Sequence, residues 1–187
     1  MNYAAIKKND IANGTGVRVS LFVSGCRHHC KNCFNPETWD FNFGTEFTDE
    51  TIKEIINEFE NDYLEGLSLL GGEPFEPENQ QELIRLVKIF KEKFPQKSVW
   101  CYTGFSFENQ LLAGKVGELT VVKELLSYID VLVDGRFIEE LKNPGLLFRG
   151  SSNQNIIDVK KSLAENKMVL LDGVWERKMG NGNIYDA

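Results

Sequence analysis

Short apolar runs rich in β-branched residues alternate along this chain with amphipathic segments that have the period of an α-helix. The apolar runs end at turn-forming residues and predict four strands, at 17–23, 67–70, 97–102 and 129–133. The amphipathic segments predict helices from about Thr48, after Pro77 and over 121–126. Alternation of this kind is typical of parallel β/α units with right-handed crossovers, so we expect an α/β fold.

The length of 187 residues fits one domain that can bury a substantial core. We place this core at about 15–172, where the runs 155–159 and 168–171 are candidates for two later strands. The C-terminal tail, 173–187, has no clear pattern, and we expect either a docking segment or disorder there.

The charge balance bears on the partners of the chain. The net charge is −7, from 28 acidic and 21 scattered basic residues, which argues against a nucleic-acid surface. No apolar run approaches the roughly 18 residues that span a bilayer. The segment before Ile11 lacks the apolar stretch of a secretory signal. We therefore expect a cytoplasmic protein with no nucleic-acid and no membrane partner.

Unusual residues follow each of the four predicted strands. A cluster of cysteines follows the first strand, Gly71-Gly72-Glu73-Pro74 the second, Thr103-Gly104 the third and Asp134 the fourth. Parallel α/β folds carry their functional loops at the carboxyl ends of the strands. The sequence therefore predicts that these four loops meet at one rim.

Three of the four cysteines fall within eight residues. Cys26, Cys30 and Cys33 have the spacing Cys-x3-Cys-x2-Cys on a short segment, residues 26–33, that we call the cysteine loop. A [4Fe–4S] cluster normally takes four cysteines, so three would leave one iron open to a substrate or cofactor. In a cytosolic protein a group of closely spaced cysteines indicates metal or redox chemistry. Cys101 stands alone, and we expect it to be a buried structural thiol.

Zinc is the alternative for the cysteine loop. His28 and His29 lie between the thiols, so the alternative is a closed Cys3His site in a zinc-stabilised binding module. Its ligands would be crowded into eight residues rather than split into two pairs. The histidines are otherwise polar loop residues that shape the surroundings of an iron–sulfur cluster.

The cysteine spacing, together with Gly71-Gly72-Glu73-Pro74, resembles the radical S-adenosylmethionine (SAM) superfamily. Further blocks, in matching order, resemble more narrowly the activating proteins of anaerobic ribonucleotide reductase. These blocks are 25–39, 70–75, 102–105, 133–137 and 149–154.

The resemblance implies a fold and an activity. The fold would be an incomplete, open β/α barrel of parallel strands with outer helices, since 187 residues fall short of the about 250 of a closed eight-fold barrel. The open iron would bind SAM, and reductive cleavage would give a 5′-deoxyadenosyl radical. That radical would abstract hydrogen from a glycine of a partner reductase, with a flavodoxin-like protein as electron donor. A small-molecule radical SAM enzyme, such as a deazapurine synthase, is the alternative.

The resemblance also implies which residues hold SAM. The backbone of Asn32, Cys33 and Phe34 would meet the adenine, although many superfamily members carry an aromatic residue where this chain has Asn32. Chemistry suits Gly71 and Gly72 to this role, because glycine lets the backbone approach a ligand closely.

Charged and polar residues complete the expected site. The Glu73 carboxylate would accept hydrogen bonds from the SAM ammonium group. Thr103 and Asp134 would lie near its methionyl end with a monovalent cation, unless they form a helix cap and a turn. Arg136 or Arg149 would pair with the SAM carboxylate or face solvent.

Overall fold

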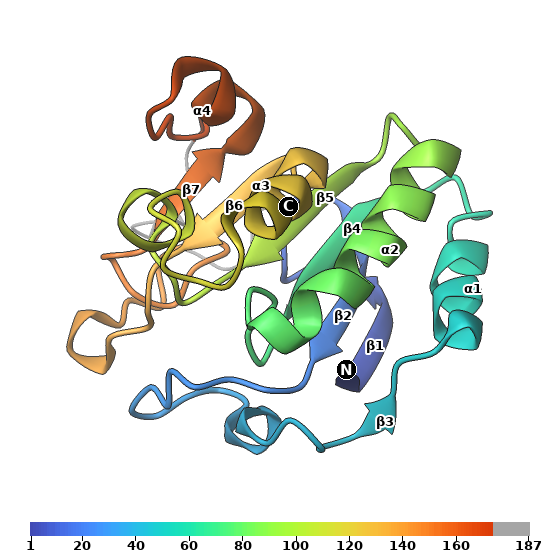
Figure 1. The fold of residues 1–187 in the computed structure, drawn as a ribbon, viewed down its shortest axis with the longest axis horizontal. Helices are drawn as coiled ribbons and strands as arrows, with labels where there is room; N and C mark the ends of the chain where they lie inside the picture. The colour runs from blue at the N-terminus through green and yellow to red at the C-terminus, as the bar shows by residue number, and fades with distance from the viewer. Residues whose placement is uncertain (174–187) are drawn as a thin grey trace, which may run out of the picture.

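The structure is a computed structural model that describes residues 1–173, so most of the expected tail, residues 174–187, lies outside the described residues. It shows a mixed α/β fold built on one sheet (Figure 1). Seven strands within residues 1–173 pair in the order β3-β1-β2-β4-β5-β6-β7. Their bounds are β1 Asn2–Asp10, β2 Val17–Val23, β3 Thr45–Glu46, β4 Leu64–Gly71, β5 Ser98–Tyr102, β6 Val131–Asp134 and β7 Asn155–Asp158.

The centre of the sheet is parallel, as predicted. β2 pairs with β4, β4 with β5 and β5 with β6, all in parallel register. The edges differ from the prediction, because β1 runs antiparallel to β2 and β3, and β7 runs antiparallel to β6. β1 and β3 were not predicted. The strand expected at 168–171 is wrong, since this stretch makes one isolated bridge, between Leu170 and Ile157.

Four α-helices lie in the described part of the chain: α1 Asp49–Glu58, α2 Pro77–Lys93, α3 Leu119–Tyr128 and α4 Val159–Glu165. Helix α1 begins after Thr48, whose hydroxyl accepts from Thr51 N in a reciprocal capping box. Helix α2 begins with Pro77, whose fixed φ suits the first helical turn. Short turns of other helix types are η1 Pro36–Trp39, η2 Phe107–Leu111 and η3 Glu139–Leu141.

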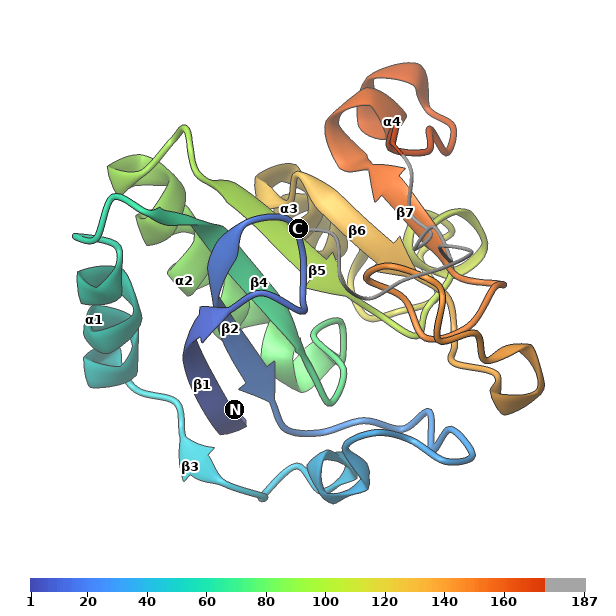
Figure 2. The same cartoon turned by 180° about the vertical axis from the view of Figure 1, so that it is seen from behind.

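The two faces of the sheet have different roles. Alternate strand residues, such as Leu21, Leu69 and Cys101, are fully buried in the main core with helices α1, α2 and α3, which lie on one side of the sheet (Figures 1 and 2). Cys101 is thus buried, as expected. Each fully buried Leu or Phe contributes about 1.5–3 kcal/mol. The intervening residues, among them Phe22 and Tyr102, face the opposite side and line a cavity.

Within residues 1–173, no helix combines the length and apolar character that crossing a bilayer requires.

Candidate functional site

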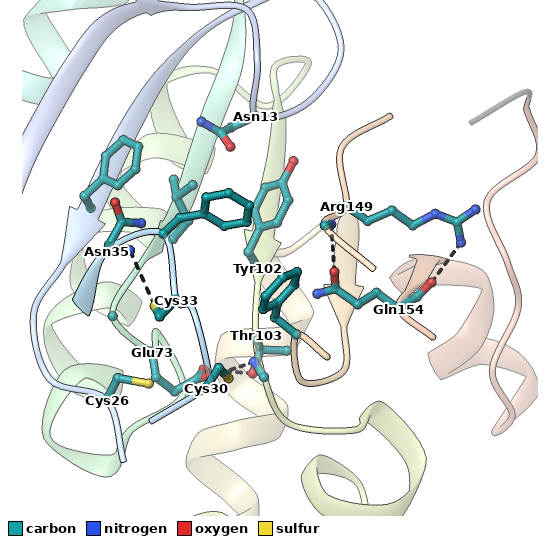
Figure 3. A pocket seen from close by; sticks show the side chains of 18 of the residues that line it. Asn13, Cys26, Cys30, Cys33, Asn35, Glu73, Tyr102, Thr103, Arg149 and Gln154 are labelled. Carbon is teal, nitrogen blue, oxygen red and sulfur yellow. Dashed lines mark hydrogen bonds between the residues drawn. The ribbon is translucent and has the colours of Figure 1, made fainter. Parts of the chain in front are cut away.

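A cavity of about 660 Å³ opens on the face of the sheet opposite helices α1–α3 (Figure 3). Its walls come from loops that follow β2, β4, β5 and β6, which confirms that the strand ends meet at one rim. Most of the residues singled out from the sequence line it: Cys26, Cys30, Cys33, Phe34, Gly71, Gly72, Glu73, Thr103 and Arg149. Asn32, Asp134 and Arg136 are absent from this lining.

The cysteine loop leaves β2 and packs at once against the end of β4. Gly25 N donates to Thr38 O at 2.8 Å, and Glu73 N donates to Gly25 O at 2.9 Å. The approach is so close that a Cβ atom on Gly72 would lie 2.7 Å from Gly25 O and 2.9 Å from Thr38 O. Glycine at position 72 therefore lets the loop and the strand end share this space.

The loop thiols differ in their exposure. Cys26 is buried, whereas Cys30 and Cys33 are partly exposed, and none of the three is in a disulfide. Burial raises the pKa of the Cys26 thiol to about 12. Cys33 Sγ accepts a hydrogen bond from Asn35 N at 3.4 Å. Since a metal binds the thiolate, metal binding at Cys26 releases a proton.

The loop fits an iron–sulfur cluster better than a zinc ion. A Cys3His zinc site needs four ligands around one ion, whereas a four-iron cluster takes its cysteines at separate irons. The histidines are engaged elsewhere: His28 Nε2 lies 3.0 Å from Glu73 Oε2, and the His29 ring lies 4.6 Å from that of Trp39.

Glu73 is a buried centre of hydrogen bonding, with 1% of its surface exposed. Its Oε1 atom accepts from Phe75 N and from Thr103 Oγ1, both at 2.8 Å. Its Oε2 atom accepts from Gly104 N at 2.7 Å and contacts His28 Nε2. A carboxylate offers about four acceptor sites, so this one is fully used by the protein. Glu73 thus cross-links three segments, and the expectation that it accepts from a bound ammonium group is revised.

The backbone of the two glycines remains on the cavity wall. Gly71 has φ +109°, a conformation that favours glycine, and a Cβ atom there would lie 2.7 Å from Phe22 Cα. Gly71 and Gly72 therefore present main chain, rather than side chain, to whatever occupies the cavity.

Thr103 and Asp134 have separate partners. Thr103 Oγ1 donates to Glu73. Buried Asp134 accepts from Phe107 N at 2.7 Å and from Asn155 Nδ2 at 2.9 Å, so its carboxylate holds η2 and the start of β7. The structure does not bring these two side chains together as a pair facing the cavity.

Asn32 and Phe34 lie on the outer part of the cysteine loop. Asn32 is exposed and has φ +56°, a left-handed conformation that asparagine tolerates well. The Phe34 side chain is 67% exposed, and its ring lies 5.5 Å from that of Phe137. Asparagine before the third cysteine is therefore explained by the backbone conformation of the loop.

The two arginines of the expected site serve the backbone. Arg136 donates to His28 O and so ties the cysteine loop to the segment after β6. Arg149 Nη1 donates to Gln154 O at 2.8 Å, on the cavity wall (Figure 3).

Other residues of the site were missed by sequence reasoning. The cavity is also lined by Asn13, Tyr102 and Gln154 (Figure 3). Phe137 is a further lining residue. Tyr102 directly follows Cys101 in the strand, and successive strand side chains point to opposite faces of the sheet. Because Cys101 points into the main core, Tyr102 points toward the cavity. Asn13 lies in the connection between β1 and β2, and no motif marks it.

Arg27 was also missed. Its guanidinium donates to Glu76, which is buried at the start of α2, and to Glu78. The same group lies 4.4 Å from the centre of the Phe41 ring. These contacts raise the pKa of Arg27, chiefly through its hydrogen bonds to Glu78 and Glu76, and fasten the cysteine loop to α2.

Known proteins resemble this chain over most of its length. The sequence model of a family described as a 4Fe-4S single cluster domain matches residues 12–157. An anaerobic ribonucleoside-triphosphate reductase-activating protein of Enterobacteria phage T4 is 40% identical over 156 residues, covering 83% of this chain and 93% of that protein. Proteins of the same name are 41% identical in Haemophilus influenzae (83% and 97% covered) and 40% identical in Escherichia coli K12 (82% and 96%).

Proposed function

The chain belongs to the 4Fe-4S single cluster domain family and to the anaerobic ribonucleoside-triphosphate reductase-activating proteins, and we propose that it activates such a reductase by reductive cleavage of SAM. The observation that carries this proposal is the cavity, which Cys26, Cys30 and Cys33 share with Gly71 and Gly72. It gives one site both soft sulfur ligands and exposed main chain.

We propose that the sheet is an open β/α barrel of the radical SAM type. Its four central strands are parallel, helices α1–α3 lie on one side, and the cavity lies on the other. The order of strands in the described residues ends at β3 and β7, so the sheet has two edges rather than a closed ring. The opening between these edges suits a site that must admit a segment of another protein.

Cys26, Cys30 and Cys33 would hold the [4Fe–4S] cluster, with one iron left for SAM. A cluster held there would supply the electron for reductive cleavage of SAM to methionine and a 5′-deoxyadenosyl radical. Transfer of a hydrogen atom from a glycine Cα of the reductase to that radical would leave 5′-deoxyadenosine and a glycyl radical. The protein positions these groups and excludes water and side reactions.

The chain's own residues orient SAM in this proposal. The carbonyl groups of Gly71 and Gly72 accept hydrogen bonds from its ammonium group, since the Glu73 carboxylate is already used. The backbone of Asn32, Cys33 and Phe34 meets the adenine.

Two residues hold the loops of the site in place. Thr103 holds Glu73, and Asp134 holds η2, so both fix the loops that surround the cavity. Neither has to touch SAM for the arrangement to work.

The partner in this proposal is an anaerobic ribonucleoside-triphosphate reductase, which offers a glycine-bearing loop. A flavodoxin-like protein supplies the electron. The cavity has apolar walls next to its polar rim, including Phe22, Phe34 and Phe137, which suits a water-excluding radical reaction.

The test is electron paramagnetic resonance (EPR) of anaerobically purified protein, reconstituted with iron and sulfide, reduced, and measured with and without SAM. We expect a [4Fe–4S]⁺ signal that changes when SAM is added, and 5′-deoxyadenosine as a product. Uptake of zinc without an iron signal would reject the proposal.

A further inference from the structure

His28 connects the cysteine loop to the ends of two strands. Its Nε2 atom lies 3.0 Å from Glu73 Oε2, and because Glu73 accepts from each of its other partners, we assign the proton of this hydrogen bond to Nε2. The ring packs on Gly104, where a Cβ atom would lie 2.5 Å from His28 Cδ2. The Phe105 ring meets it edge on, with 4.4 Å between centroids. The imidazole is therefore held by a hydrogen bond at Nε2 and by packing of its ring on Gly104 and Phe105.

This contact lies between the two halves of the candidate site. His28 is midway between Cys26 and Cys30 in the sequence, and Glu73 follows directly on Gly71-Gly72. Glu73 is itself held by three other hydrogen bonds, so its contact with His28 fixes the position of the cysteine loop relative to β4.

We propose that His28 is a positioning residue that sets the distance between the cysteine thiols and the backbone of Gly71-Gly72. The inference rests on the proposed function, in which SAM binds to both halves at once. Loss of the contact lets the cysteine loop move relative to β4, so that SAM no longer reaches the open iron and the glycine carbonyls together.

The neighbouring histidine provides a matched control. His29 is exposed, has φ +48°, and its ring contacts Trp39 of η1. Asparagine tolerates this backbone conformation, so His29→Asn makes the same chemical change next to His28 without backbone strain.

Two polar replacements of His28 test the hydrogen bond to Glu73, because only one of them keeps a donor within reach. In His28→Gln the amide nitrogen reaches about as far as Nε2 and keeps the donor. In His28→Asn the amide nitrogen stops about where Nδ1 lies, so Glu73 loses this partner. Gly104→Ala gives a third test, because its Cβ displaces the ring while leaving His28 and Glu73 unchanged.

The first measurement is limited trypsin digestion of the full chain before iron is added, since Arg27 and Lys31 are cleavage sites on either side of His28. We expect His28→Asn and Gly104→Ala to raise the rate of cleavage after Lys31 about tenfold, the order expected when a hydrogen bond to a charged group is lost. His28→Gln and His29→Asn should stay within about twofold of the wild type, as polar replacements that keep this hydrogen bond.

The second measurement is SAM cleavage by the reconstituted variants. We expect His28→Asn to raise the KM for SAM about tenfold while kcat changes by less than about threefold, because ground-state positioning is what the contact supplies. His28→Gln should restore the KM.

Digestion rates and KM values that are the same in His28→Asn and the wild type would overturn the inference, and so would equal losses in His28→Gln and His28→Asn. A wild-type chain that resists trypsin but fails to cleave SAM rejects the proposed function instead. In that case the digestion rates still decide whether His28 holds the loop.

Discussion

The four cysteines of this chain carry the same thiol in different surroundings. Cys101 is completely buried between the sheet and the helices, and burial raises its pKa well above the usual value. Cys26, Cys30 and Cys33 line the cavity instead. The residue type alone therefore does not distinguish the four cysteines, whereas their position relative to the cavity does.

Replacing Cys26, Cys30 or Cys33 by Ala should abolish SAM cleavage and leave the far-ultraviolet circular dichroism spectrum unchanged. The reason is that each change removes one proposed ligand at the rim and no side chain of the main core. Cys101→Ala should keep iron content and activity, at a cost of about 1 kcal/mol in the free energy of unfolding for the small cavity. Full production of deoxyadenosine by any of the three loop variants would contradict the ligand assignment.

Gly72 and Gly145 form a second comparison at the scale of residues. Neither has a positive φ, so an added methyl group acts through space alone. In Gly72→Ala it would meet Gly25 O at 2.7 Å, whereas in Gly145→Ala the nearest atom is Asn143 Oδ1, at 3.1 Å on the surface.

We therefore expect Gly72→Ala to lower the free energy of unfolding by about 1–3 kcal/mol and to reduce iron uptake. Gly145→Ala should change both by little. Urea denaturation and iron analysis of the two variants provide the measurement. Equal stability of the two would show that the cysteine loop is not tightly packed on β4.

At the scale of elements, local patterns predicted the centre of the sheet and its helices. β2 is predicted at its observed bounds, and the starts of α1 and α2 follow from Thr48 and Pro77. The pairing direction of a strand is not contained in its period, so the antiparallel edges could not be predicted. β1 was missed because register shifts between Tyr3 and Ala5 and between Lys7 and Asp10 interrupt its alternation.

The sequence predicted which residues of each loop belong to the site, but not the hydrogen bonds between the loops. The cysteines and Gly71-Gly72 were found from short spacings. The hydrogen bonds of Glu73 come from Thr103 and His28, 30 and 45 residues away, so the sequence shows only an acidic residue. Arg18 shows the same dependence on distant residues. Arginines in strands ordinarily reach solvent, but Arg18 is fully buried. Its guanidinium donates hydrogen bonds to Ser68 and Ser98, among others.

Asp130, the residue before β6, connects α2, β5 and α4. Its carboxylate accepts from Lys91 of α2 at 2.6 Å and from Val99 N of β5 at 2.7 Å, and it pairs with Lys160 of α4 at 2.5 Å. Burial acts to raise its pKa, but the hydrogen bonds from Lys160, Lys91 and Val99 outweigh it, and the pKa lies below its ordinary 3.8.

A carboxyl group with a lowered folded-state pKa stabilises the fold above its unfolded pKa, and this contribution is lost as the pH falls through the folded value. We expect Asp130→Asn to lower the melting temperature by a few degrees at pH 7. The difference from the wild type should shrink as the pH falls below about 3.8. Thermal melts from pH 7 to pH 3 test this, and a constant difference across the range would contradict it.

At the scale of the whole molecule, the main core and the cavity lie on opposite faces of the sheet. The residues that bury most apolar surface belong to the strands and to helices α1–α3, and the cysteine loop contributes little to them. The sheet and helices should therefore form without a metal, unlike a zinc module whose folding depends on its ion.

We expect protein stripped of iron by a chelator to keep its far-ultraviolet circular dichroism and a cooperative thermal transition. The melting temperature should fall by about 10 °C or less, since only the contacts of the cysteine loop are weakened. Loss of the cooperative transition on removal of iron would show that the cluster is part of the core.

In the proposed function, the separation of core and cysteine loop lets the chain fold before the cluster is assembled. A chain that folds first and takes up iron and sulfide afterwards can be synthesised while oxygen is present and matured when oxygen is gone. Loss of the cluster would then leave a folded polypeptide that can take up iron and sulfide again.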